Sequence, residues 1–246
     1  MCHRDDSRPP AADGAVSAAS QGGLELRAGD GTRVLAHQAR PATATGVGVV
    51  VLPDVRGLHD YYRQLAVRFA EIGAESVAVD YFGRTAESDD RSEAFEFMPH
   101  VQQTTPGGVA ADVAAGVAYL AERGATRIFT VGFCFGGGYS WRQSADTSGL
   151  AGCIGFYGRA ALVNDAADRL QAPLLMLVAG ADAHLPVSDA EELAETARAH
   201  VPVELVVFDG APHSFFDRSF AEHEQACARA WSQIQRFLAT AAASAG

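Results

Sequence analysis

The sequence contains no run of about 18 or more apolar residues, the length that an α-helix needs to cross a bilayer. Its first residues also lack the basic-then-apolar order of a secretory signal. We therefore expect a cytoplasmic protein that has no membrane partner.

Cysteine is scarce, with 4 residues in a chain of 246, and no two are spaced as Cys-x-x-Cys. A disulfide framework and a structural zinc site are therefore not expected, and each cysteine should be a free thiol. Cys2-His3 supplies too few ligands to hold a metal by itself. Clusters of Lys or Arg are also missing, and the formal net charge is −11 at pH 7. Without a basic footprint, a nucleic acid is not an expected partner.

The composition predicts one folded domain behind a short tail. Residues 1–22 are rich in Pro, Asp, Ser, Ala and Gly without apolar periodicity, which is typical of a disordered or loosely attached segment. Removing this tail should barely change the melting temperature. Residues 23–242 are expected to form a single domain, because a chain of 246 residues with 48% hydrophobic content can bury one large core.

The order of apolar patterns predicts the fold class. From Leu24 to Gln38, alternating residues flank Gly29-Asp30-Gly31, which favours an antiparallel hairpin. Amphipathic stripes predict helices around residues 62–72 and 109–120, another from Ser188 in a capping box with Glu191, and a last one from about Phe220. Almost entirely apolar runs, which predict strands covered on both faces, lie at Val47–Leu52, Ser76–Val79, Ile128–Val131, Cys153–Tyr157, Leu174–Val178 and Val203–Phe208. This alternation predicts a mostly parallel, doubly wound α/β sheet led by the antiparallel hairpin.

The most informative stretch is Gly132-Phe133-Cys134-Phe135-Gly136, which joins a predicted strand to a predicted helix. Small residues two before and two after a nucleophile permit the sharp turn, called a nucleophile elbow, that lifts the central side chain above a sheet. The helix N-terminus that follows favours a thiolate, so Cys134 is the candidate nucleophile. The alternative is a glycine-rich turn whose cysteine is merely small and buried.

An acid and a histidine follow Cys134 in the chain order of α/β-hydrolases, each just after a predicted strand. In this arrangement His213 accepts the thiol proton, while Asp182 fixes the ring tautomer and stabilises the imidazolium. Taken alone, Asp182 is equally well a turn aspartate and His213 a loop histidine, but their joint placement favours a catalytic triad. His184 is a competing base, although it shares a loop with Asp182 and so is poorly placed to be held by it.

Acyl transfer also needs N–H donors for a developing oxyanion. The residue after the nucleophile, Phe135, is the first candidate. We assign the second donor to Val55, because the first buried strand ends at Leu52 and the chain then turns beneath the elbow. The alternative for this segment is an ordinary strand-to-helix loop.

Five motifs together resemble one family over roughly Leu24 to Leu238. They are Gly132-Phe133-Cys134-Phe135-Gly136-Gly137, Leu52-Pro53-Asp54-Val55-Arg56-Gly57, Val79-Asp80-Tyr81-Phe82-Gly83-Arg84, Gly180-Ala181-Asp182 and His213-Ser214-Phe215. On these residues the chain resembles the dienelactone hydrolase family of the α/β-hydrolase superfamily, in which the elbow cysteine is the most specific feature. The resemblance implies hydrolysis of a small ester or enol-lactone, without a metal or an organic cofactor, in the breakdown of aromatic compounds.

The resemblance also implies roles for residues around the triad. Family members that open lactone rings use a glutamate in the first strand's loop to help form the thiolate, and Asp54 is the candidate here. They also bind a substrate carboxylate with two arginines, one of which Arg84 matches. The second is expected four residues after the histidine, where this chain has Asp217 followed by Arg218. We therefore expect a carboxylate-bearing substrate held by Arg84, with Arg56 or Arg218 assisting, in a monomer or small homo-oligomer.

Two other functions compete with hydrolysis. A flavodoxin-like amidotransferase or DJ-1-type protein also places cysteine on such a turn, but an amidotransferase carries His-x-Glu late in the chain, and His213-Ser214-Phe215 does not match. A catalytically silent binding module would keep the fold and use its cleft to hold a small ligand, since fold alone does not imply activity. The intact elbow, acid and histidine argue against this second alternative.

Overall fold

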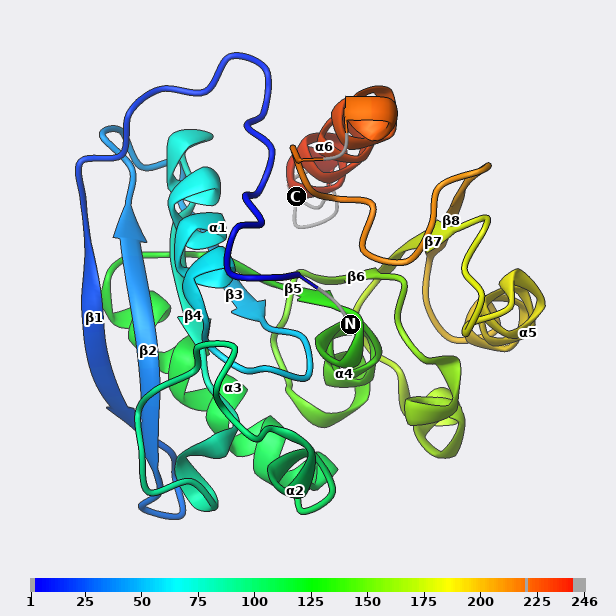
Figure 1. Cartoon of the computed structure of the whole chain (residues 1–246). Coiled ribbons are helices and arrows are strands. Elements are labelled where there is room, and N and C mark those ends of the chain that lie inside the picture. The colour runs from blue at the N-terminus through cyan, green and yellow to red at the C-terminus, as the bar shows by residue number, and fades with distance from the viewer. Residues whose placement is uncertain (1–2, 220, 241–246) are drawn as a thin grey trace.

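The computed structural model describes residues 3–219 and 221–240 and contains an eight-stranded mixed sheet (Figure 1). The strand order is β1-β2-β4-β3-β5-β6-β7-β8. Strand β2 pairs antiparallel with β1 and β4, and every other pair is parallel. The strands are β1 Ser20–Arg27, β2 Arg33–Arg40, β3 Val47–Leu52, β4 Glu75–Val79, β5 Arg127–Phe133, β6 Gly152–Phe156, β7 Leu174–Ala179 and β8 Val203–Phe208. The predicted fold class, including the leading hairpin, is confirmed.

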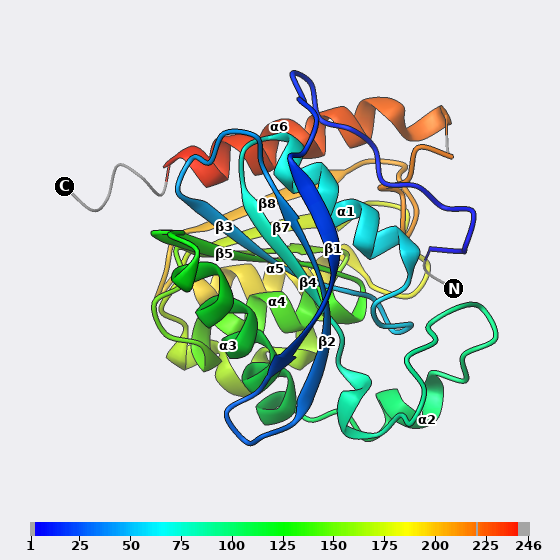
Figure 2. The same ribbon diagram turned by 90° about the vertical axis from the view of Figure 1, so that its left-hand side faces the viewer.

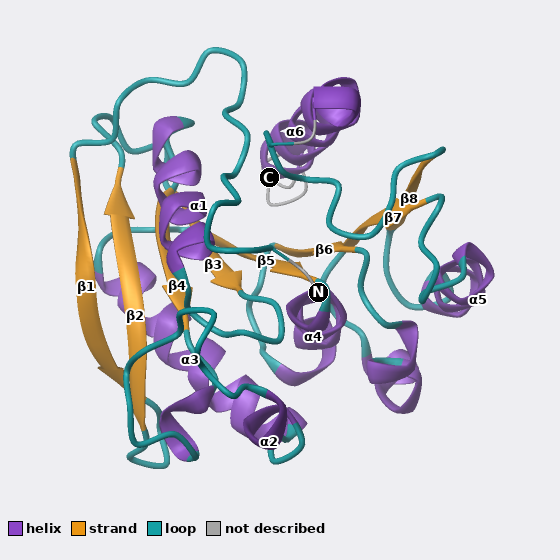
Figure 3. Cartoon of the chain, viewed as in Figure 1, coloured by secondary structure: helices purple, strands orange, loops and turns teal. Residues whose placement is uncertain are grey.

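Helices cover both faces of the sheet, as Figures 2 and 3 show. One core lies under α1 and α6 and the other under α3, α4 and α5. The buried strands β3 to β7 lie between the two cores, which explains why their sequences read as apolar runs without alternation. The α-helices are α1 Asp60–Glu71, α2 Met98–Val101, α3 Pro106–Glu122, α4 Phe135–Asp146, α5 Val187–Ala197 and α6 Glu224–Thr240, and the 3₁₀ turns are η1 Phe82–Arg84, η2 Ala160–Leu162, η3 Asn164–Arg169 and η4 Ala221–His223.

Two predicted helix starts need correction. Helix α5 begins at Val187 behind Pro186, whose side chain makes no cap, so Ser188 lies inside the first turn and the predicted capping box is wrong. Pro186 takes the N-cap with φ −58° and ψ 140°, two residues before the predicted serine, because its ring fixes φ near that value. Phe220 lies outside the described residues, and α6 begins at Glu224 after the short η4 turn.

Residues 3–19 pack against the domain, contrary to the loosely attached tail predicted for residues 1–22. This segment passes between α1 and α6 (Figure 1). The Trp231 indole donates to Pro10 O at 3.1 Å, Val16 N donates to Glu71 O at 2.9 Å, and the His3 side chain is buried. Strand β1 itself starts at Ser20. These anchors are single long-range contacts, and they leave no periodic pattern in the sequence.

None of the helices in the described ranges combines the length and apolar composition that spanning a bilayer requires.

Candidate active site

Cys134 occupies a nucleophile elbow between β5 and α4. Its backbone has φ 55° and ψ −112°, a strained conformation for a residue with a side chain. A Cβ atom on Gly132 would lie 1.9 Å from Gly136 O, and one on Gly136 would lie 2.2 Å from Pro53 O. Both positions therefore require glycine, as the sequence motif predicted.

Backbone strain among the described residues concentrates around this elbow. Three non-glycine residues have positive φ: Cys134, Tyr157 with 35° and Ser214 with 63°. Tyr157 follows β6, the neighbour of β5, and its ring lies 4.8 Å from the His213 ring. Ser214 directly follows His213. Strain of this kind costs about 1–3 kcal/mol per residue and persists where the surrounding structure enforces it, often at functional sites.

His213 joins the acid to the cysteine. Its Nδ1 lies 2.5 Å from Asp182 Oδ2, and its side chain also hydrogen-bonds to that of Cys134. Burial lowers the pKa of His213, but the contacts with Cys134 and Asp182 raise it more, so the net pKa lies above the ordinary histidine value. The structure thus brings the three predicted triad residues together.

The Asp182 carboxylate is oriented by its own loop. Its Oδ1 accepts hydrogen bonds from the backbone N–H groups of His184 at 2.9 Å and Leu185 at 3.2 Å. These bonds leave Oδ2 directed at His213. His184, the competing base, contacts the acid through its backbone, and its side chain is exposed.

The two predicted oxyanion donors flank the elbow from neighbouring strands. Strand β3 pairs with β5 so that Leu52 lies opposite Gly132, which puts the loop after β3 beside Cys134. Phe135 opens α4, and Val55 follows Pro53, the residue whose carbonyl group contacts Gly136. Among the described residues, no hydrogen bond from either N–H to another protein group is found. Their donation to a substrate oxygen stays a prediction.

Asp54 is fully buried at the base of the same loop. Its carboxylate accepts from Arg56 N at 2.9 Å and from His3 N at 3.3 Å, and His59 Nε2 lies 3.6 Å away. Burial raises the pKa of Asp54, but the contacts with His59, His3 and Arg56 outweigh it, and the net pKa lies below the usual range. The thiol-activating role predicted for Asp54 stays a prediction.

The three arginines predicted to bind substrate have different environments. Arg84 forms ion pairs with Asp30 and with Asp112, the latter at 2.7 Å. Arg56 is buried and donates to His3 O at 2.8 Å and Asp5 Oδ1 at 2.5 Å. Arg218 is the exposed one of the three, and its backbone N–H donates to Arg8 O. Arg84 and Arg56 are therefore already paired with carboxylates of this chain. The substrate-binding role of the three arginines stays a prediction.

The sequence analysis assigned no role at the site to three buried residues. His3 lies 3.3 Å from the Tyr157 hydroxyl and 3.5 Å from Asp217, and Arg91 forms an ion pair with Asp80 at 2.8 Å. Asp217 did carry a signal, because it replaces the arginine expected four residues after the histidine. His3, by contrast, belongs to a segment whose sequence shows no pattern.

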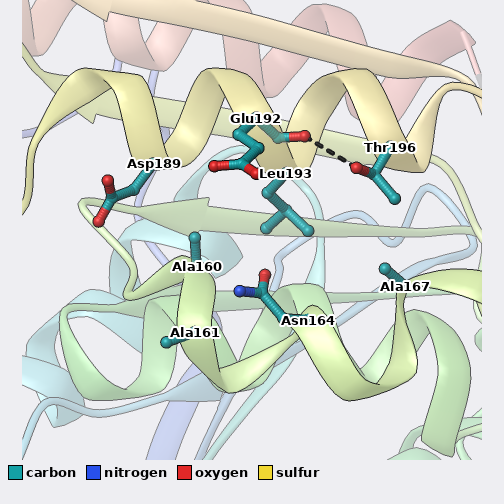
Figure 4. A pocket seen from close by; sticks show the side chains of 8 residues that line it. All are labelled: Ala160, Ala161, Asn164, Ala167, Asp189, Glu192, Leu193 and Thr196. Atoms are coloured by element: carbon teal, nitrogen blue, oxygen red, sulfur yellow. Dashed lines mark hydrogen bonds between the residues drawn. The ribbon is translucent and has the colours of Figure 1, made fainter.

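An open cavity of about 460 Å³ lies between α5 and the η2–η3 segment (Figure 4). It is lined by Ala160, Ala161, Asn164, Ala167, Asp189, Glu192, Leu193 and Thr196. A smaller cavity shares Ala160 and Asp189 with it and extends to Tyr157 and Asp182. The smaller cavity therefore borders Asp182, the proposed acid.

Comparison with known proteins relates the chain to one family. A sequence model of the dienelactone hydrolase family matches residues 34–242. The "Putative carboxymethylenebutenolidase" of Salmonella typhi is 27% identical over 245 residues, which cover 92% of this chain and 88% of that protein. The "Probable 2-oxo-3-(5-oxofuran-2-ylidene)propanoate lactonase" of Bradyrhizobium is 28% identical over 228 residues, covering 85% of this chain and 90% of that protein.

A solved crystal structure has a similar fold. The crystal structure of a "Putative Dienelactone Hydrolase" from Klebsiella pneumoniae superposes with a TM-score of 0.77 at 26% sequence identity. The match covers 89% of this chain and 99% of that chain. The likeness thus extends over nearly the whole fold.

Proposed function

The chain belongs to the dienelactone hydrolase family, which makes it a lactone or ester hydrolase, and we propose that it cleaves its substrate by acyl transfer to Cys134. Support comes chiefly from one observation. His213 is hydrogen-bonded to Cys134 and to Asp182 at once, while Cys134 stands on a strained elbow at the start of a helix. A nucleophile, a base and an orienting acid in contact are the signature of nucleophilic catalysis.

The proposed reaction has two halves. In the first, Cys134 Sγ attacks the carbonyl carbon while the thiol proton passes to His213. The resulting oxyanion accepts hydrogen bonds from the backbone N–H groups of Phe135 and Val55. The tetrahedral adduct then breaks its C–O bond, and His213 returns the proton to the leaving oxygen. In the second, His213 takes a proton from water as the water oxygen attacks the thioester carbon. The C–S bond then breaks, the acid product leaves, and His213 returns the proton to Cys134 Sγ.

The proposed substrate is a small ester or an enol-lactone. The lactonase name of the Bradyrhizobium relative supports a cyclic ester, in which the leaving oxygen stays attached to the acyl group. A place in the breakdown of aromatic compounds, a carboxylate on the substrate and a cytoplasmic location stay predictions from the sequence.

The test follows p-nitrophenyl acetate hydrolysis in the wild type and in Cys134→Ala. Turnover should disappear in the variant and after iodoacetamide treatment of the wild type, with the label found on Cys134. Cys153 and Cys227 are buried, and burial raises the pKa of their thiols to about 12 and about 11, so they should stay unlabelled. Cys153→Ala is the matched control and should keep wild-type turnover. An active Cys134→Ala would refute the cysteine mechanism.

A further inference from the structure

His3 is bound among the residues that surround the triad. Its ring stacks on Tyr61 with centroids 3.6 Å apart, and its Nε2 lies 3.3 Å from the Tyr157 hydroxyl. On its other side, Nδ1 lies 3.5 Å from Asp217 Oδ2. Tyr157 in turn contacts the His213 ring. One side chain therefore separates His3 from the proposed catalytic base.

Residues 3–8, which we term the N-terminal clasp, bind the loop that carries Val55. His3 N donates to Asp54, and His3 O accepts from Arg56. Asp5 adds a second bond to the Arg56 guanidinium. Asp54 and Arg56 are the two chain neighbours of Val55, so the clasp holds the proposed oxyanion donor from both sides.

The same clasp binds the loop that carries His213. Besides the contact of His3 with Asp217, Arg8 N donates to Asp217 Oδ1 at 3.1 Å. Arg8 O accepts from Arg218 N at 3.0 Å. Asp217 is 1% exposed, so without these partners its charge would be left buried and poorly compensated.

We infer that the N-terminal clasp sets the relative position of the oxyanion loop, residues 53–57, and the histidine loop, residues 210–218, with His3 as its central positioning residue. The clasp bonds to both loops through six consecutive residues. The start of α1 also reaches both loops, because His59 N donates to Gly57 O and the Tyr61 hydroxyl donates to Phe216 O. Misplacing reacting groups by about 1 Å can cost on the order of 10²-fold in rate, so a loosened clasp lowers turnover without removing any group that touches substrate. This inference rests on the proposed function.

The experiment compares His3→Ala, His3→Gln and Asp5→Ala with Arg4→Ala, whose exposed side chain bonds to neither loop. Glutamine keeps one donor for Asp217 and one acceptor for Tyr157, so it should restore part of what alanine loses. Asp5 is half exposed, and its removal leaves the buried His3 in place, so this variant should fold whether or not His3→Ala does. Each protein is assayed on p-nitrophenyl acetate, and backbone hydrogen exchange is followed in parallel.

For His3→Ala we expect kcat to fall about tenfold or more with KM changed less than about twofold. Exchange at the amides of Arg56 and Arg218 should accelerate, while β5 and β7 keep wild-type protection. Asp5→Ala should show the same change at Arg56 to a smaller extent, and Arg4→Ala should show none.

The two readouts separate failure of the clasp from failure of the proposed function. An inactive wild type refutes the hydrolase mechanism, yet exchange still reports whether the clasp holds both loops. Wild-type kcat and unchanged exchange at Arg56 in both Asp5→Ala and His3→Gln would overturn the inference. So would increased activity in the clasp variants, because the segment would then obstruct the site.

Discussion

At the scale of single residues, His213 has the most demanding role, because it must exchange protons with Cys134 while Asp182 holds its ring. We predict that His213→Ala lowers kcat on the order of 10³-fold or more, and that Asp182→Asn lowers it less. The double variant should be little worse than His213→Ala, because the acid acts through the histidine. His184→Ala, the exposed histidine of the acid's loop, should retain wild-type kcat. Losses that multiply in the double variant would contradict a single acid–base unit.

Asp217 offers a prediction about pH. Burial raises the pKa of its carboxyl group, but hydrogen bonds from His3, Ser7 and the backbone N–H groups of Ser219 and Arg8 outweigh burial, and the net pKa lies well below the usual range. A lowered folded-state pKa contributes stability above the unfolded value of about 3.9, which is lost as the pH falls towards the folded value.

We therefore predict that Asp217→Asn lowers the free energy of unfolding by about 1–3 kcal/mol at pH 7. The difference from wild type should shrink when urea unfolding is repeated near pH 3. Asp209→Asn, on an exposed side chain of the preceding loop, is the control and should change neither value. If the difference in unfolding free energy between Asp217→Asn and wild type stays constant from pH 7 to pH 3, the negative charge of Asp217 is not what stabilises the site.

Residues differ in how far the sequence could locate them. Cys134, Asp182 and His213 lie in the loops that follow the ends of β5, β7 and β8. Strand ends can be located from local apolar runs, so the convergence of these residues at one edge of the sheet was predictable. The environment of Arg84 was not, because its partners Asp30 and Asp112 come from the hairpin turn and from α3. Long-range pairing of this kind has no signature in the spacing of residues.

At the scale of elements, the junction of β5, β3 and α4 decides whether the elbow forms. A Cβ on Gly136 would lie 2.2 Å from Pro53 O and 2.3 Å from Leu52 O, so helix α4 must retreat from the end of β3 to admit a side chain. Since Val55 lies two residues after Pro53 in the same loop, the strain should spread to the proposed oxyanion hole.

We predict that Gly136→Ala destabilises the protein by about 1–3 kcal/mol and lowers kcat on the order of 10²-fold. Gly107→Ala is the matched control in the first turn of α3, where a Cβ would meet nothing within 4 Å. There the substitution should leave activity unchanged and raise stability by about 0.4–1 kcal/mol. Thermal unfolding and p-nitrophenyl acetate turnover measure both. Equal behaviour of the two variants would show that the elbow tolerates a side chain.

Elements with strong local patterns were predicted well, and those held by distant contacts were not. The apolar runs located β3 to β8. For β3 to β7 the reason is that burial on both faces demands continuous apolar sequence, whereas β8 is an edge strand and only partly buried. The N-terminal segment has no such run, and it is fixed instead by His3, Pro10 and a few backbone hydrogen bonds. A prediction from the spacing of apolar residues classifies such a segment as disordered, because that spacing carries no information about long-range partners.

At the scale of the whole molecule, net charge bears on which substrates reach Cys134. The formal charge is −11 at pH 7, and Asp54 and Asp217 lie buried beside the site. Of the three arginines predicted to bind a carboxylate, Arg56 and Arg84 are already paired with acids of the chain. The electrostatic field that an approaching anionic substrate meets is therefore set mainly by the net negative charge of the protein.

We predict that kcat/KM for a carboxylate-bearing ester rises several-fold as ionic strength increases from about 0.01 to 0.15 M, because salt screens the repulsion between substrate and protein. A neutral ester of the same size should show no such dependence and serves as the control for salt effects on the enzyme itself. The opposite slope, a rate that falls with salt for the acidic ester alone, would show a local attractive field. In that case Arg218→Ala, which removes the exposed arginine, should abolish the fall, whereas Arg84→Ala should abolish it only if Arg84 leaves Asp30 and Asp112 to bind the substrate.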